Sequence, residues 1–173
     1  MAKKRKSRLN ILILGILAFV LAGVALALFS LKGIVITNSS GKETLSYTLF
    51  QYTFGYKDGD TTVLEMNGGL LTAFILIIVG ALGSLFGSFL GYKKQKVGAL
   101  CACVASLCLI AGGILVFCIG PLTGTEIGEI SGNLFGTKIV AGYVKLGIGV
   151  WLSGCLSALG GIAAVPVSLL SIK

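Results

Sequence analysis

Apolar residues fill four long stretches of this chain, and polar residues gather between them. The apolar stretches cover residues 10–31, 70–92, 97–119 and 140–170. A helix that crosses a lipid bilayer needs about 20 predominantly apolar residues. Inside lipid, each backbone polar group must be paired within its own segment, and a helix achieves this. The pattern therefore predicts an all-α membrane protein, in which residues 1–173 form a single bundle of four transmembrane helices.

The polar connections between these helices differ in length. Residues 32–69 and 120–139 are long connections, whereas residues 93–96 form a short turn. In the first long connection, β-branched residues at 34–37 favour a strand, and the aromatic-rich residues 47–54 predict a second, longer strand. The long connections thus predict a small extracellular β-sheet cap on the bundle.

Turn-forming residues separate the predicted strands of this cap. They occupy residues 38–41 and 58–60, where Asn, Ser, Gly and Asp favour turns. Residues 61–65 follow the second turn and predict a third strand. The Gly-rich residues 120–139 predict one further edge strand.

Basic residues are distributed unevenly about the predicted helices. The formal net charge is +8, from 14 basic and six acidic residues. The two chain ends and the 93–96 turn carry nine basic residues and no acidic one, whereas the long connections carry all six acidic residues. By the positive-inside rule, both termini are cytoplasmic. We expect a multi-pass protein of the plasma membrane.

The basic residues of the cytoplasmic side are candidates for contact with lipid. Anionic headgroups attract each Lys or Arg near the membrane surface by about 1 kcal/mol. The candidates are Lys3, Lys4, Arg5, Lys6, Arg8, Lys93, Lys94 and Lys96. The lipid bilayer is therefore the first expected partner, and we expect no nucleic-acid partner.

The first apolar stretch also has features of a cleaved signal peptide. A basic segment precedes it, and Ala25-Leu26-Ala27 fits an A-x-A cleavage site. However, the stretch continues to Leu31, so it is long enough to cross a bilayer. A retained first helix is the favoured interpretation, and cleavage would leave three helices in the same orientation.

Small residues recur every four positions in the second and fourth apolar stretches. This spacing places them on one helix face, where backbones can approach closely and van der Waals contact drives association. The candidate packing residues are Gly80, Gly83, Ser84, Gly87, Ser88, Gly91, Gly149, Ser153, Ser157 and Gly161. The helix that meets these faces could belong to the same chain or to another copy in a homo-oligomer.

Large apolar and aromatic side chains in the first long connection have two interpretations. They are Tyr47, Leu49, Phe50, Tyr52 and Phe54. In the favoured interpretation they form an interfacial belt that fastens the cap to the helix ends, since such belts are general. In the alternative they form a contact surface for a membrane-protein partner.

The five cysteines raise the question of metal, redox or lipid chemistry. Three of them lie in KKQKVGALCACVASLC, residues 93–108. A zinc site needs four ligands, usually Cys and His, and the chain has no His. Packing as small apolar residues is the favoured interpretation, ahead of lipidation at Cys101 or Cys103. We expect no metal site and no cofactor.

Catalytic and ion-coupling patterns are missing from the sequence. Without His, the commonest general base is absent, and no nucleotide-binding or nucleophile motif occurs. The predicted helices hold no ionisable residue at depth, which argues against proton-coupled transport. The sequence therefore predicts a protein that is not an enzyme.

The order of segments resembles the claudin/PMP22-like tetraspan membrane proteins. The shared features are a longer first outer connection with strands, a short basic inner turn, a smaller second outer connection and Gly-rich helices. The claudin loop signature of Trp, Gly-Leu-Trp and two cysteines has no counterpart here, since the only Trp is Trp151. The resemblance implies a left-handed four-helix bundle beneath a small sheet, and it carries over no site residue.

These observations predict a function based on contacts. We expect a non-enzymatic interaction, scaffold or accessory subunit in the membrane. The alternative is a passive channel or small-solute transporter formed by a homo-oligomer and lined by serines. Those serines are Ser84, Ser88, Ser153 and Ser157.

Overall fold

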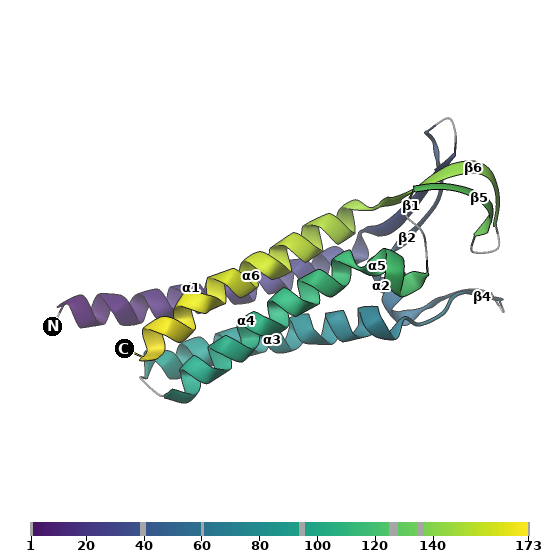
Figure 1. The fold of residues 1–173 in the computed structure, drawn as a ribbon. Coiled ribbons are helices and arrows are strands. Elements are labelled where there is room, and N and C mark those ends of the chain that lie inside the picture. Colours follow the sequence, from purple (N-terminus) through teal and green to yellow (C-terminus); the bar gives the residue numbers. More distant parts are fainter. Residues whose placement is uncertain are drawn as a thin grey trace.

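Four long helices run side by side and carry a sheet at one end (Figure 1). The computed structural model describes the backbone of residues 2–38, 41–59, 61–93, 96–124, 128–134 and 137–172, and their side chains except at 2–8, 128–142 and 171–172. The long helices are α1 (Ala2–Ala27), α3 (Gly68–Tyr92), α4 (Lys96–Phe117) and α6 (Ile148–Ile172). Each is long and apolar enough to cross a membrane.

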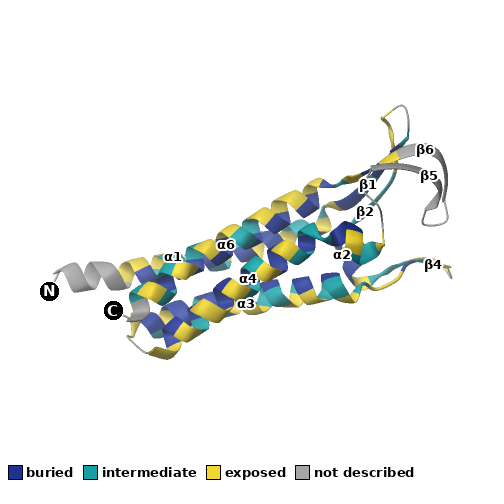
Figure 2. Cartoon of the chain, viewed as in Figure 1, coloured by how far each residue is buried: buried dark blue, intermediate teal, exposed yellow. Residues whose placement is uncertain are grey.

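The helices form a ring in which α1 and α4 each lie between α3 and α6. α1 begins and α6 ends at the end away from the sheet, where α3 also ends and α4 begins (Figure 1). Figure 2 shows exposed residues along the outward faces of the helices. Many of these exposed residues are large and apolar, including Val20, Val79, Leu107 and Leu159. A belt of this kind suits contact with lipid.

Strands from both long connections build one antiparallel sheet in the order β2-β1-β6-β5. The strands are β1 (Lys32–Asn38), β2 (Glu43–Thr48), β5 (Gly128–Leu134) and β6 (Thr137–Leu146). In the register, Ile34 faces Tyr47 of β2 and Leu146 of β6. The edges of the sheet are therefore β2 and β5, one from each connection.

A separate hairpin follows, made of β3 (Tyr56–Asp58) and β4 (Thr61–Leu64). Its turn contains Gly59 at φ +58°, a left-handed conformation that glycine adopts without strain. The predicted turn at 58–60 and the predicted strand at 61–65 agree with this hairpin.

Short helices join these parts. They are the 3-10 turn η1 (Leu28–Ser30), α2 (Leu49–Phe54) and α5 (Ile119–Thr123). Thr48 begins α2 with a capping box, in which its Oγ1 accepts from Gln51 N at 3.3 Å and its own N donates to Gln51 Oε1 at 2.8 Å. This pairing satisfies backbone groups that would otherwise lack partners at the helix start.

Two predicted elements near the sheet differ from the structure. The predicted helix of residues 140–170 was wrong at its start, because its first seven residues belong to β6 and α6 begins at Ile148. The predicted strand of residues 47–54 was also wrong beyond Thr48, because α2 replaces it.

Two further boundaries were placed differently from the structure. The second long connection contributes two strands, with β6 inside the sheet, where the sequence predicted one edge strand. The third predicted helix, 97–119, ends at Phe117, and Ile119 already belongs to α5.

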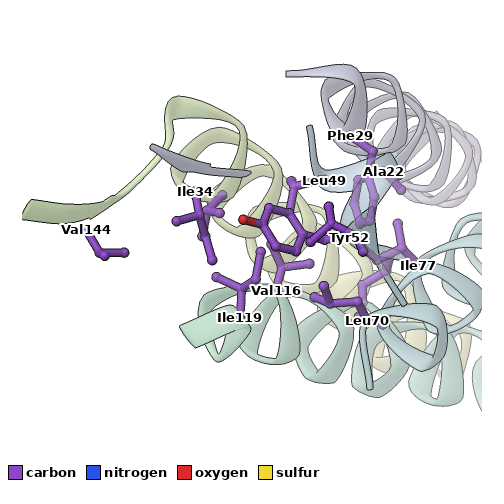
Figure 3. Close-up of a cluster of buried hydrophobic side chains, with 14 of the residues drawn as sticks. Ala22, Phe29, Ile34, Leu49, Tyr52, Leu70, Ile77, Val116, Ile119 and Val144 are labelled. Carbon is purple, nitrogen blue, oxygen red and sulfur yellow. The ribbon is translucent and has the colours of Figure 1, made fainter. Parts of the chain in front are cut away.

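One apolar cluster joins the sheet to the helix ends (Figure 3). Tyr52 lies at its centre, among residues of α2, α3, α4 and β1. Ile34 of β1 and Val144 of β6 extend the cluster into the sheet, and Ile77 extends it into the bundle. The sheet and the bundle therefore share a core among the described residues.

Candidate contact site at the sheet end of the bundle

The five residues predicted as a contact group separate into buried and exposed members. Leu49 and Tyr52 are 0% and 2% exposed, whereas Phe50 and Phe54 are 36% and 49% exposed. Tyr47 on β2 is half-buried. Because α2 is helical, successive residues point in different directions rather than to two alternating faces. Leu49 and Tyr52 are therefore core residues, which excludes them from the alternative interpretation of an exposed surface for a partner.

Four phenylalanines gather where α2 meets the helix ends. Phe50 and Phe54 stack with ring centroids 5.9 Å apart, and they lie 5.7 Å and 5.4 Å from Phe74 of α3. Phe29 of η1 lies 5.2 Å from Phe74 and 6.0 Å from Phe50. Edge-to-face pairs at such distances stabilise beyond their burial by about 0.5–1.5 kcal/mol. This phenylalanine cluster holds α2 against α3 and the end of α1.

Three tyrosines form a second aromatic group on the other side of α2. Tyr47 lies 6.1 Å from both Tyr52 and Tyr56. Burial raises the pKa of Tyr52 well above its ordinary value of 10.0, and Tyr47 adds to the shift. Burial also raises the pKa of Tyr47, with smaller contributions from Tyr56 and Asp58. The hydroxyls of Tyr47 and Tyr52 stay protonated at neutral pH, so they do not supply a catalytic base.

A cavity of about 250 Å³ lies between α2, the segment before α3, and α5. Asn67 forms one wall, where its Nδ2 donates to Leu122 O at 2.6 Å and its Oδ1 accepts from Leu70 N at 3.0 Å. Glu65 is the only carboxylate among the described lining residues, and no basic side chain joins it in that lining.

The predicted packing glycines of α3 lie against α4 within the same chain. A methyl group added at Gly87 would lie 2.8 Å from Ala102 N, and one at Gly83 would lie 3.0 Å from Ala105 Cβ. Gly80 faces Leu109 of α4. Gly91 is also buried, where the backbone of α4 passes it. Close approach of two backbones explains why these positions hold glycine.

The packing glycines of α6 meet two different elements. Gly161 faces α4, and a methyl group there would lie 2.9 Å from Ser106 O. Gly149 lies instead against Leu31 and Lys32, where the chain enters β1. It therefore docks the start of α6 onto the sheet rather than onto another helix.

The four serines proposed to line a channel are all buried, with exposures of 0–1%. Ser84, Ser88 and Ser153 donate to carbonyls of their own helices. Ser157 donates across to Leu109 O of α4 at 2.7 Å, and Ser106 donates back to Gly161 O of α6 at 2.8 Å. Among these four serines, Ser157 links two helices and the other three bond within their own helix. Because all four are buried, they do not line an open path in this structure.

The predicted headgroup contacts lie at the end away from the sheet. Lys93 and Lys96 are exposed there. Lys94 lies outside the described residues, and so do the side chains of the N-terminal group. That group consists of Lys3, Lys4, Arg5, Lys6 and Arg8, whose backbone begins α1.

All five cysteines are free. Cys103 and Cys155 are exposed, and the other three are half-buried. Cys103 and Cys155 therefore lie on outward faces, and the prediction that the cysteines pack inside the bundle does not hold for these two. Among the described residues, no three His, Cys, Asp or Glu side chains gather as metal ligands would.

Comparisons with protein families, with curated proteins and with solved structures found no match. The resemblance to claudin/PMP22-like proteins remains a prediction from the order of segments. The function is therefore argued from the geometry of the chain itself.

Proposed function

We propose that this protein is a non-enzymatic integral membrane protein that acts as an interaction or accessory subunit. In this proposal the four long helices cross the plasma membrane, both termini are cytoplasmic, and the sheet lies outside. A folded sheet built from two distant segments is the observation that carries the proposal. It presents a defined surface, whereas the bundle beneath it is closed by its own packing.

The contact surface in this proposal is the face of the sheet turned away from the core. Ile34 and Ile36 point into the core, so their neighbours along β1 point to the opposite face. On that face Val35 pairs with Ser46 of β2 and with Lys145 of β6. Lys145 is exposed and Val35 is half-buried.

Tyr143 extends the same face, because it follows Lys145 at a spacing of two residues along β6. It is 42% exposed. The face thus combines an aromatic ring, a cation and small polar groups. Interfaces between separately folded proteins are enriched in Tyr and have a polar rim, and Tyr143 and Lys145 fit these two parts. We therefore expect the outer part of a membrane-protein partner as the occupant.

Purification from the native host in mild detergent, followed by native mass spectrometry, tests the proposal. We expect a second polypeptide at a fixed ratio. Lys145→Glu should abolish its recovery, whereas Lys57→Glu on the separate hairpin should not, because both lysines are exposed and only Lys145 lies on the proposed face. Equal melting temperatures would show that both variants fold.

Other outcomes would overturn the proposal. Recovery of the chain only as a monomer would contradict an accessory role. A homo-oligomer without a partner would favour the passive channel, which liposome flux then tests. A partner retained by Lys145→Glu would move the contact away from this sheet face.

A further inference from the structure

We propose that α2 is an interfacial anchor, with the exposed faces of Phe50 and Phe54 in contact with lipid of the leaflet on the sheet side. This inference rests on the membrane location in the proposed function. Its occupant is lipid at the boundary between the hydrocarbon and the headgroups.

The two faces of α2 differ sharply. Leu49, Tyr52 and Thr53 are buried against the shared core. Phe50 and Phe54 share the opposite side, as residues four apart on a helix do. Their rings stack at 24° and remain 36% and 49% exposed. In water this stacked pair would expose apolar area with no function.

The depth of the phenylalanine cluster follows from the length of α3. The helix has 25 residues, or about 37 Å at the rise of an α-helix. A hydrocarbon core is about 30 Å thick, so a centred α3 extends about 4 Å beyond it at each end. Phe74 lies six residues after Gly68, which places its backbone about 9 Å along the helix.

Phe74 therefore starts about 5 Å inside the hydrocarbon core. Side chains on a helix lean toward its N-terminus, so the Phe74 ring lies close to the boundary. Phe54 and Phe50 contact that ring at 5.4 Å and 5.7 Å. Their exposed faces consequently lie at the depth where membrane proteins concentrate aromatic side chains.

The lateral position of α2 continues the apolar belt of the bundle. α1 ends at Ala27, and Phe29 of η1 packs against both Phe50 and Phe74. α2 thus occupies the space above the end of α1, beside the first turns of α3. Val24, three residues before the end of α1, and Ile75, next to Phe74 in α3, are 43% and 50% exposed.

The backbone of α2 suits a place where water is scarce. Leu49 N donates to Leu31 O at 3.1 Å. Thr48 N and Gln51 N are paired through the capping box. Thr53 Oγ1 donates to Leu49 O at 2.8 Å. Unpaired backbone groups are costly in lipid, and the start of α2 pairs three N–H groups without water.

Tryptophan fluorescence in vesicles tests this inference, because Trp151 is the only Trp in the chain. In a Trp151→Phe background, Phe54→Trp is reconstituted into phosphatidylcholine vesicles. The acyl chains are brominated either near the glycerol or near the chain end. We expect bromine near the glycerol to remove most of the emission, bromine near the chain end to remove less, and aqueous acrylamide to remove little.

Two control positions make the outcomes distinguishable. Phe86→Trp reports the other half of α3, about 27 Å along the helix and about 6 Å inside the hydrocarbon core. Phe86 is 61% exposed, and this variant should be quenched by brominated lipid. Tyr143→Trp reports the outward sheet face and should be quenched by acrylamide alone. Phe50→Trp serves as the second position if Phe54→Trp fails to fold.

Quenching of Phe54→Trp by acrylamide, with Phe86→Trp still quenched by brominated lipid, would overturn the anchor and leave the membrane location intact. Protection of Phe54→Trp from both quenchers would overturn it in favour of a protein occupant, such as a second copy. Loss of lipid quenching at Phe86→Trp as well would overturn the membrane location itself.

Discussion

At the scale of single residues, the crossing of α3 and α4 has no room for a methyl group at Gly87. A Cβ there would lie 2.8 Å from Ala102 N and 3.1 Å from Gly98 O. Both contacts are with backbone, which cannot move aside as a flexible side chain can. We expect Gly87→Ala to lower the free energy of unfolding by about 1–3 kcal/mol, measured by denaturation in detergent followed by circular dichroism.

Gly23 of α1 provides the matched control for Gly87→Ala. No atom lies within 4 Å of a Cβ added there. Gly23→Ala should leave the free energy of unfolding unchanged or raise it by up to about 1 kcal/mol through helix propensity. Equal destabilisation by both substitutions would contradict the role of Gly87 in close packing.

Two serine hydroxyls cross between α4 and α6 in opposite directions. Ser106 donates to Gly161 O, and Ser157 donates to Leu109 O. Hydrogen bonds between membrane helices contribute about 0.6–2 kcal/mol. We expect Ser106→Ala and Ser157→Ala each to lower the free energy of unfolding by such an amount, measured in the same detergent assay.

Ser84 is the control for the crossing serines, because it is equally buried but donates to Ala81 O of its own helix. Ser84→Ala removes no link between helices. It should change the free energy of unfolding by less than about 0.5 kcal/mol. If Ser84→Ala and Ser157→Ala lowered the free energy of unfolding equally, the bonds between helices would stabilise the fold no more than a bond within one helix.

At the scale of elements, hydrophobic length predicted the long helices well and their ends at the sheet poorly. The four apolar stretches correspond to the four long helices, because a run of about 20 apolar residues has few other stable forms. Residues 140–146 are also apolar, but β6 lies inside the sheet, where Val144 is buried beside Ile36. Periodicity does not separate an interior strand from the helix that follows it.

The sequence contains a motif that indicates where α2 begins, although the aromatic residues beside it suggested a strand. Thr48 followed three residues later by Gln51 is a capping box. The sequence prediction relied on strand propensity for the aromatic residues, which depends on context. It therefore missed that Phe50 and Phe54 share one side of a helix while Tyr52 enters the core.

Asn67 joins two elements, because it caps α3 and also reaches α5. Its Oδ1 accepts from Leu70 N, and its Nδ2 donates to Leu122 O. Asn67→Ala removes both bonds and should lower the free energy of unfolding by about 2 kcal/mol. Asn67→Ser keeps a capping oxygen but is too short for Leu122, so it should cost about 1 kcal/mol. Calorimetry in detergent measures both, and equal losses would contradict a separate link to α5.

At the scale of the whole molecule, the two ends of the bundle differ in structure and in charge. At the sheet end, segments from both connections fold into a surface that shares its core with the helices. At the other end, Lys93 follows α3 and Lys96 begins α4, and both are exposed. The positive-inside rule associates such basic residues beside short connections with the cytoplasmic side.

The proposed orientation, with both termini cytoplasmic, predicts which lysines a membrane-impermeant amine reagent reaches in intact cells. Lys42 and Lys57 lie at the sheet end, and Lys93 and Lys96 lie at the opposite end. All four are exposed and lie outside the proposed partner face, so differences in labelling report their side of the membrane rather than their burial. We expect labelling of the two at the sheet end alone, measured by peptide mass spectrometry. Permeabilised cells, as the control, should show all four labelled. The reverse pattern in intact cells would place both termini outside, and equal labelling of the two groups would contradict a bundle that crosses the membrane.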